Sequence, residues 1–322
     1  MFRLFLLLFA FVTSVLIAAE FVLRHRYGFL STPLYVSDSD YEYIYAPNQD
    51  VRRFGNHIKT NEFSLRSEPI MPTDTTVVLL TGDSVVLGGS LTDNDSLAST
   101  LLEKRLSKTL GRRVRVLNVA AGSWGPDNVA AYLKKHGLFN ADLLCLVASS
   151  HDYHDHMDFQ DVVGNDINYP DKQYDFALEE LWDRYLYPRY IKDWIQVHPQ
   201  KNLDAAASPQ KSDSPSVIQK PGVGLNPGFG QLKQIAKAAD IPFFILLHPE
   251  VSEVEYGRYD EEGEAILAYA QADSVRLIRE LDKGIRLKHY RDGDVVHYTA
   301  EGQRFLSDQL YPIFLGYLKA SE

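Results

Sequence analysis

Short apolar segments that alternate with amphipathic stretches constrain the fold of this chain more than any other feature. The amphipathic stretches carry leucine and alanine at helical spacing. Apolar strands must be covered on both faces, which is typical of a parallel sheet between helices. We therefore predict an α/β fold, a three-layer α/β/α sandwich with a parallel sheet. The predicted strands are 76–81, 114–119, 143–148, 242–247 and 275–278, and the predicted helices are 97–106, 126–137, 231–239, 265–272 and 299–317.

Residues 1–26 contain the clearest targeting signal. Residues 4–19 carry no charge, and three apolar residues extend the run beyond Glu20. About twenty helical residues at 1.5 Å each span roughly 30 Å, enough to cross a bilayer. We favour an uncleaved transmembrane anchor over a cleaved signal peptide ending near Ala18 and Ala19, because the run is longer than a usual signal core. Under either interpretation the remaining chain is exported.

The remaining chain is predicted to have two parts. Residues 27–74 form an irregular or short-stranded lead-in that packs on the main domain, and residues 75–322 form that domain. The regular alternation of strands and helices stops after Asp158. Further along, residues 176–195 are rich in aromatic residues and are predicted to be helical. Residues 200–222 are rich in Ser, Pro, Lys and Asp and are predicted to form a flexible insertion. The net charge of −10 argues against a nucleic-acid partner.

A nucleophile candidate follows the first predicted strand of the sheet directly. Gly82, Asp83 and Ser84 come at its carboxyl end, where a glycine permits a sharp turn. Reacting groups of parallel sheets lie at this edge. A serine needs a base within hydrogen-bond reach to act as a nucleophile. The G-x-S-x-G elbow of α/β-hydrolases is not formed, because Val86 occupies its last glycine position.

An acid and a base are predicted just before the last helix. Asp294 precedes His297 by three residues. An aspartate can hold one imidazole nitrogen as a donor, which leaves the other free to take the serine proton. Each motif alone also fits an ordinary turn. Together they place Ser84, Asp294 and His297 at one sheet edge.

At these residues the chain resembles the SGNH (GDSL-type) hydrolases. Gly82-Asp83-Ser84 resembles their first block, Asn118 to Gly122 their second, and Asp294-x-x-His297 their last. Residues 60–66 (TNEFSLR) resemble a segment of bacterial members with an N-terminal membrane anchor. The resemblance implies the flavodoxin-like SGNH fold, an acyl-enzyme on Ser84, and an oxyanion hole that includes the N–H groups of Ser84 and Gly122.

The third family block departs from its usual pattern. Ser149-Ser150-His151-Asp152 stands where Gly-x-Asn-Asp is usual, so His151 replaces the asparagine that donates to the oxyanion. A histidine N–H can also donate, and we expect His151 to complete the hole. If it cannot, the chain is a catalytically impaired, membrane-anchored glycan-binding relative.

Other residues offer competing interpretations. On a helix, His151, His154, Asp155 and Asp158 would share one face that could hold Zn²⁺ or Mn²⁺. We favour a polar loop instead, and expect no metal and no cofactor. His248 either lines the pocket or closes a turn, and Cys145 is expected to be buried packing. Aromatic residues at helical spacing are expected to pack rather than to stack on a sugar; they are Trp182, Tyr185, Tyr187, Tyr190 and Trp194.

The resemblance thus predicts a serine-dependent ester hydrolase or O-acyltransferase. Its expected substrate is an acylated carbohydrate or a small ester. Its expected place is outside the cytoplasm, periplasmic in a bacterium, with the membrane bound through the N-terminal helix. Many anchored members of the family look associated with exopolysaccharide modification. From the resemblance we expect the same association for this chain.

Overall fold

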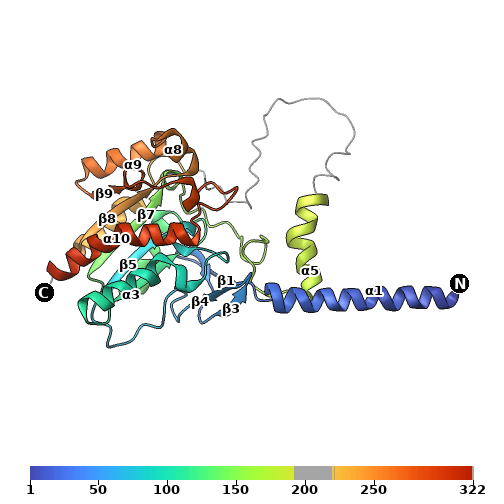
Figure 1. The fold of residues 1–322 in the computed structure, drawn as a ribbon. Coiled ribbons are helices and arrows are strands. Elements are labelled where there is room, and N and C mark those ends of the chain that lie inside the picture. The colour runs from blue at the N-terminus through green and yellow to red at the C-terminus, as the bar shows by residue number, and fades with distance from the viewer. Residues whose placement is uncertain (192–219, 221, 321–322) are drawn as a thin grey trace, which may run out of the picture.

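A five-stranded parallel sheet forms the centre of the molecule (Figure 1). The computed structural model describes residues 1–191, 220 and 222–320. The strands follow the order β6-β5-β7-β8-β9. They are β5 (Val77–Gly82), β6 (Arg115–Ala120), β7 (Leu143–Ser149), β8 (Phe243–His248) and β9 (Arg276–Arg279). Every residue of β5, β6 and β7 is buried, as their apolar composition predicts.

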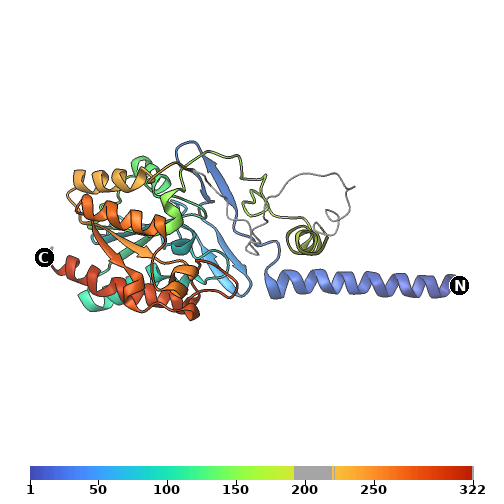
Figure 2. The same cartoon turned by 90° about the horizontal axis from the view of Figure 1, so that it is seen from above.

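Helices cover both faces of the sheet, which confirms the predicted fold class. On one face α3 (Ala98–Leu110) packs against α10 (Ala300–Ala320). On the other, α4 (Pro126–His136) packs against α7 (Gly228–Ala238), and α7 contacts α9 (Glu261–Ala272). Figures 1 and 2 show the two helical layers from the side and from above.

Local signals set the helix ends. Pro126 is the first residue of α4, where its missing N–H costs nothing. Thr299 Oγ1 accepts the N–H of Gly302 at 3.1 Å and so caps α10, as predicted. The shorter helical elements, in which η marks a 3-10 or π turn, are α2 (Ser84–Leu87), η2 (Asn94–Ser96), η3 (Ser150–Tyr153), α8 (Val251–Tyr256), η5 (Glu280–Lys283) and η6 (Leu287–His289).

The lead-in region folds as two small hairpins. In the first, β1 (Tyr35–Asp38) pairs with β2 (Glu42–Tyr45), and in the second, β3 (Asp50–Arg53) pairs with β4 (Asn56–Lys59). Ile44 of β2 and Ile58 of β4 belong to the same buried core as the sheet. The hairpins therefore pack on the main sheet. The exact division at residues 74 and 75 stays a prediction.

The N-terminal helix extends away from the rest of the molecule (Figure 1). It consists of α1 (Phe2–Val22) and the π-helical η1 (Leu23–Tyr27), and none of its residues is buried. Residues 2–27 form a helix long and apolar enough to cross a membrane, and an 18-residue window within it has a mean hydropathy of 2.5. A signal sequence near the N-terminus has the same property, so length and composition allow both the anchor and the cleaved interpretation.

A second helical segment stands beside the end of α1. It consists of α5 (Ala177–Leu181) and the π-helical η4 (Trp182–Ile191), which confirms the predicted aromatic helix as far as residue 191. Trp194 and nearly all of the predicted flexible insertion at 200–222 lie outside the described residues.

Candidate active site

The nucleophile candidate lies where β5 ends and α2 begins. The Asp83 carboxylate accepts the N–H of Val85 at 2.9 Å and caps α2, whose first residue is Ser84. Gly82 is required there, because a Cβ would lie 2.7 Å from the Val147 carbonyl oxygen and 2.7 Å from a Val86 methyl carbon. The sequence therefore places the Ser84 hydroxyl at the carboxyl edge of the sheet.

The base and the acid reach Ser84 from the loop before α10. His297 Nε2 lies 2.9 Å from Ser84 Oγ. On the other side of the ring, His297 Nδ1 lies 2.8 Å and 2.9 Å from the two carboxylate oxygens of Asp294. The structure thus brings together all three residues proposed as a triad, although Ser84 and His297 are 213 residues apart in the chain.

The Asp294 carboxylate is held ionised. Burial would raise its pKa, but the hydrogen bond with His297 and the backbone N–H groups of Val296 and His297 outweigh burial and lower the pKa well below its usual range. Both backbone groups donate to Oδ1 at 3.0 Å. An ionised Asp294 keeps the proton on His297 Nδ1, so Nε2 can accept the proton of Ser84.

Two of the proposed oxyanion donors lie beyond the ends of adjacent strands. Gly82 and Ala120 are paired as the last residues of β5 and β6, and Ser84 and Gly122 each follow two residues after the end of their strand. Ser84 begins α2, so its N–H has no acceptor within the helix. No acceptor for the Gly122 N–H is found among the described residues outside regular helices and strands. Both groups are therefore free for an oxyanion.

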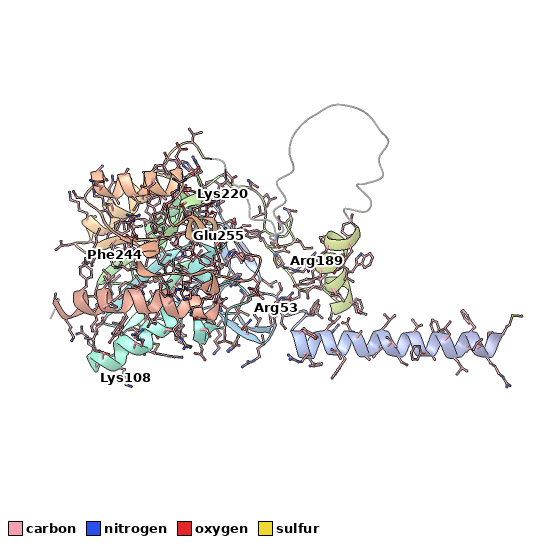
Figure 3. All side chains as sticks on the ribbon, turned by 45° about the horizontal axis from the view of Figure 1, so that its top comes forward. Arg53, Lys108, Arg189, Lys220, Phe244 and Glu255 are labelled. Atoms are coloured by element: carbon pink, nitrogen blue, oxygen red, sulfur yellow. The ribbon has the colours of Figure 1, made fainter. Side chains whose placement is uncertain are left out.

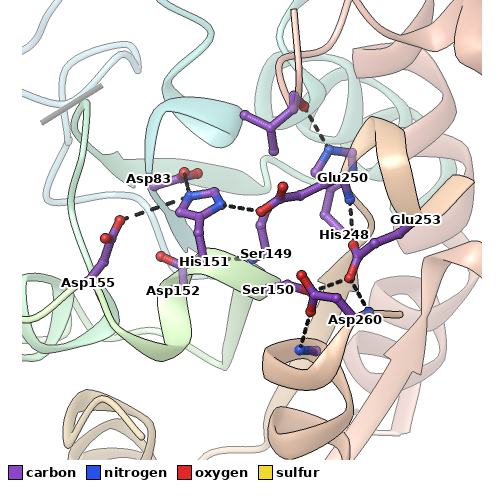
Figure 4. A network of polar contacts seen from close by, with 12 residues as sticks. Asp83, Ser149, Ser150, His151, Asp152, Asp155, His248, Glu250, Glu253 and Asp260 are labelled. Atoms are coloured by element: carbon purple, nitrogen blue, oxygen red, sulfur yellow. Dashed lines mark hydrogen bonds and ion pairs between the residues drawn. The ribbon is translucent and has the colours of Figure 1, made fainter. Parts of the chain in front are cut away.

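The third proposed donor, His151, follows β7 at the same edge. Its side chain is 29% exposed, and both ring nitrogens face carboxylates (Figure 4). Nδ1 lies 3.0 Å from Glu250 Oε1, whereas Nε2 lies 3.4 Å from Asp83 Oδ2. The contact to Asp83 is longer than an ordinary hydrogen bond, so the proton on Nε2 is the one that another acceptor could take.

The acidic surroundings determine the charge of His151. Burial would lower its pKa, but hydrogen bonds to Asp83 and Glu250 and the charges of Asp152 and Asp155 raise it well above its usual value. The pKa of Asp152 is raised well above its usual value by burial, and burial raises that of Asp155 to about 6. The cluster therefore favours an imidazolium that faces ionised Asp83 and Glu250.

The alternative metal-binding face is not assembled. His154 lies 3.6 Å from Glu262, and the Asp158 carboxylate accepts from Gln160. The residues that do come together are Asp83, His151 and Asp152, whose ligand atoms lie within 4.8 Å of one another. His154 and Asp158 turn to other partners because residues 150–153 form one 3-10 turn rather than a continuing α-helix.

The other candidates have structural roles. His248 is fully buried; its Nδ1 contacts Glu280 Oε2 at 2.6 Å, and its Nε2 lies 2.8 Å from the Val296 carbonyl oxygen. It therefore holds the loop of His297 instead of lining a pocket. Cys145 is buried in β7, and burial raises the pKa of its thiol, which makes it a packing residue as predicted. Tyr185 packs on Phe29, as predicted, but the prediction of packing is wrong for Trp182, Tyr187 and Tyr190, whose side chains are exposed on the outside of the helical segment.

Two arginines that sequence reasoning missed fix the loops around the triad. Arg291 donates to the Gly88 carbonyl at 2.8 Å and to the Tyr298 carbonyl at 3.1 Å, so it ties the loop after Ser84 to the flank of His297. Arg66 is buried and donates to the carbonyl oxygens of Leu87, Gly89 and Thr92, each at 2.8 Å. Arg66 ends the segment 60–66 singled out above, but no sequence signal gives either arginine this role, because their acceptors are carbonyl groups that every residue has.

No model of a known protein family and no curated protein matches the chain. Among solved structures, it is similar to a lipase/acylhydrolase from Enterococcus faecalis, at 11% identity and a TM-score of 0.42, over 75% of this chain and 96% of the other. It is also similar to the acetyl xylan esterase Axe2 from Geobacillus stearothermophilus, at 12% identity and a TM-score of 0.40, over 76% and 96%.

At these identities and TM-scores, the likenesses carry no argument about what the chain does.

Proposed function

We propose that this chain is a serine-dependent ester hydrolase or O-acyltransferase of the SGNH type. The observation that carries the proposal is the contact of 2.9 Å between Ser84 Oγ and His297 Nε2, with Asp294 on the opposite ring nitrogen. A nucleophile, a base and an orienting carboxylate within hydrogen-bond reach are the set required for acyl transfer.

The mechanism is a double displacement. Ser84 Oγ attacks the ester carbonyl carbon while His297 Nε2 takes its proton. The tetrahedral intermediate collapses, His297 returns the proton to the departing alkoxide, and the acyl group stays on Ser84. Water or a sugar hydroxyl then attacks the acyl-enzyme by the same steps. The developing oxyanion would be bound by the N–H groups of Ser84 and Gly122 and by His151.

The proposed substrate is an acylated carbohydrate or a small ester outside the cytoplasm. Support comes from the apolar helix at residues 2–27, which would anchor the catalytic part at a membrane, and from the resemblance of residues 60–66 to a segment of anchored bacterial members. Mass analysis of the protein recovered from membranes tests the anchor, because a cleaved signal peptide would remove about the first 19 residues.

A fluorophosphonate probe tests the activity. It labels a serine only when a base activates it. Labelling of the folded wild type that is lost in Ser84→Ala and in His297→Ala is the expected result. A folded wild type that takes up no label and releases no acid from short p-nitrophenyl esters would contradict the proposal. Product analysis with an acetylated polysaccharide then separates transfer to a sugar from hydrolysis.

The second candidate is a non-catalytic glycan-binding relative. It is favoured by one observation, that both ring nitrogens of His151 face carboxylates instead of an open oxyanion site. Polysaccharide binding by a wild type that the probe does not label would support this candidate over the enzyme.

A further inference from the structure

The helical segment 177–191 stands crosswise on the end of α1. In Figure 1 it is upright while α1 lies horizontal, and in Figure 2 it is seen end-on beside the same end of α1. It lies between the globular part and the rest of the apolar helix. Since a transmembrane helix runs close to the bilayer normal, a segment crosswise to it runs along the membrane surface.

Along the axis of α1, this segment lies where the apolar run of residues 4–23 ends. Residues 4–23 span about 30 Å as a helix, the thickness of a bilayer core. Glu20, in the last turn of α1, accepts the N–H groups of Ala177 and Leu178 at 2.8 Å and 2.9 Å, and so caps α5. Arg24 lies 2.6 Å from Glu20 and donates to the Asp175 carbonyl at 3.0 Å. The first turn of α5 is therefore fixed at the boundary of the apolar run.

A buried ion pair fastens the same segment to the lead-in region. Glu180 forms a pair at 2.5 Å with Arg53, and both side chains are almost fully buried. Glu180 also accepts the N–H of Leu30 at 2.8 Å, and Tyr185 lies 3.0 Å from the Arg53 guanidinium. Figure 3 shows Arg53 between the globular part and the upright segment that carries Arg189. These contacts fix the direction of the segment relative to α1.

The outer face of the segment carries exposed aromatic side chains. Trp182 is 48% exposed, Tyr187 41% and Tyr190 66%. Trp182, Leu186 and Tyr190 recur every four residues and so follow one face. Tyr185 is on the inner face, where it packs against Phe29. Tryptophan and tyrosine are enriched at the level of lipid headgroups, where an apolar ring and a polar tip are both satisfied.

We propose that α5 and η4 form an interfacial helix that lies in the headgroup region of the membrane, with Trp182, Leu186 and Tyr190 in contact with lipid. This inference rests on the proposed membrane anchoring by α1. The lipid surface is the occupant because Glu20 and Arg24 join the start of this segment to the end of the apolar helix, which places its exposed rings on the membrane side of the domain.

The interfacial helix gives the anchored domain a fixed orientation. In Figure 1, α10 begins at the catalytic edge, directly after His297, and ends on the side of the domain far from α1. The carboxyl edge of the sheet, with Ser84, therefore faces the side of the molecule on which α1 and the interfacial helix lie. Substrate would reach Ser84 from the space between the domain and the bilayer.

Cysteine labelling of the full chain in phosphatidylcholine/phosphatidylglycerol vesicles tests the inference. The native Cys145 is buried, so a fluorophore attaches selectively to Trp182→Cys or Tyr190→Cys. Tyr256→Cys, at a residue 78% exposed on α8, is the control for solvent, and Phe9→Cys is the control for the bilayer core. Labels at 182 and 190 are expected to be quenched by lipids with a nitroxide near the headgroup and protected from iodide, whereas the Tyr256→Cys label shows the reverse.

Each other outcome overturns a defined step. If labels at 182 and 190 respond to iodide as the Tyr256→Cys label does, while lipids with a nitroxide in the acyl chain quench the Phe9→Cys label, the anchor stands and the interfacial helix is wrong. If lipids with an acyl-chain nitroxide do not quench the Phe9→Cys label, both the anchor and the inference fail. If the labels are protected from both quenchers, another protein surface or a second copy covers the segment, and the lipid contact is wrong. A circular dichroism spectrum and an unfolding temperature like those of the wild type show that each variant is folded.

Discussion

Replacing Asp294 with asparagine is predicted to move the ring proton of His297 from Nδ1 to Nε2, while the loop keeps its conformation. Only Oδ1 of Asp294 accepts the two backbone N–H groups of residues 296 and 297. In Asp294→Asn, the amide oxygen must stay at that position, because an NH₂ group there would face two donors. The NH₂ group then faces His297 Nδ1, which has to become the acceptor, and the ring proton moves to Nε2.

The wrong tautomer of His297 cannot take the proton of Ser84. Loss of the equivalent carboxylate in a serine protease, a worked case for this type of triad, lowers kcat about 10⁴-fold. We expect a loss of similar size here, equivalent to about 5 kcal/mol of transition-state stabilisation. KM is expected to change little, because Asp294 acts on the ring of His297 and not on bound ester.

Hydrolysis of p-nitrophenyl acetate and the rate of fluorophosphonate labelling measure the effect. Asp292→Asn is the matched control, since Asp292 lies in the same turn and is exposed. An Asp294→Asn variant with kcat within about tenfold of the wild type, alongside an inactive Ser84→Ala, would refute the role of Asp294. Asp294 also stabilises the fold above its unfolded pKa, and this contribution is lost as the pH falls through the lowered folded pKa. Acid unfolding of Asp294→Asn should therefore depend less steeply on pH.

Substitutions at three further residues test the third oxyanion donor, the acidic cluster beside it and the buried ion pair of the lead-in region. If the His151 ring is an oxyanion donor, His151→Ala should lower kcat roughly 10²–10³-fold. His151→Asn should retain more activity than His151→Ala. Equal kcat for His151→Ala and the wild type would exclude the donor role. Asp155→Asn should stabilise the fold at pH 8 by about 3 kcal/mol but not at pH 4, because burial raises the pKa of Asp155 to about 6 and the ionised form is disfavoured in the folded state. Thermal unfolding at both pH values measures this, and an equal shift at both would contradict it. Arg53→Met should lower the free energy of unfolding by about 3–5 kcal/mol, because Glu180 would remain buried and unpaired. Urea unfolding measures this free energy. In the control, the double variant with Arg53→Met and Glu180→Leu is expected to recover the lost stability.

The triad could be predicted because its parts lie at positions that topology alone brings together. The ends of parallel strands meet at one edge, so a serine after the first strand of the sheet and an Asp-His pair before the last helix were expected to approach. The prediction required no knowledge of side-chain rotamers. His151 was placed at this edge by the same reasoning, since β7 pairs directly with β5.

The partners of His151 and the supporting arginines could not be predicted in this way. Glu250 lies 99 residues from His151 and comes within 3.0 Å only because β7 and β8 end in register, with Ser149 opposite His248. The sequence favoured a polar loop over a helix around His151, but it could not show that a 3-10 turn directs His154 toward Glu262. Arg66 belongs to a lead-in without sustained periodicity, and its buried position depends on how that lead-in packs on the loop after α2.

The loop that carries His297 is held mainly by hydrogen bonds. Several polar side chains are buried beneath the site for this reason. His248 contacts the carbonyl oxygen of Val296, and Glu280 binds both His248 and the hydroxyl of Tyr298, each at 2.6 Å. Apolar packing alone would tolerate small rotations of this loop, whereas hydrogen bonds with fixed directions do not. Burying these groups is costly unless each is paired. The 2.9 Å contact between Ser84 and His297 therefore depends on a network that fixes geometry at some cost to stability.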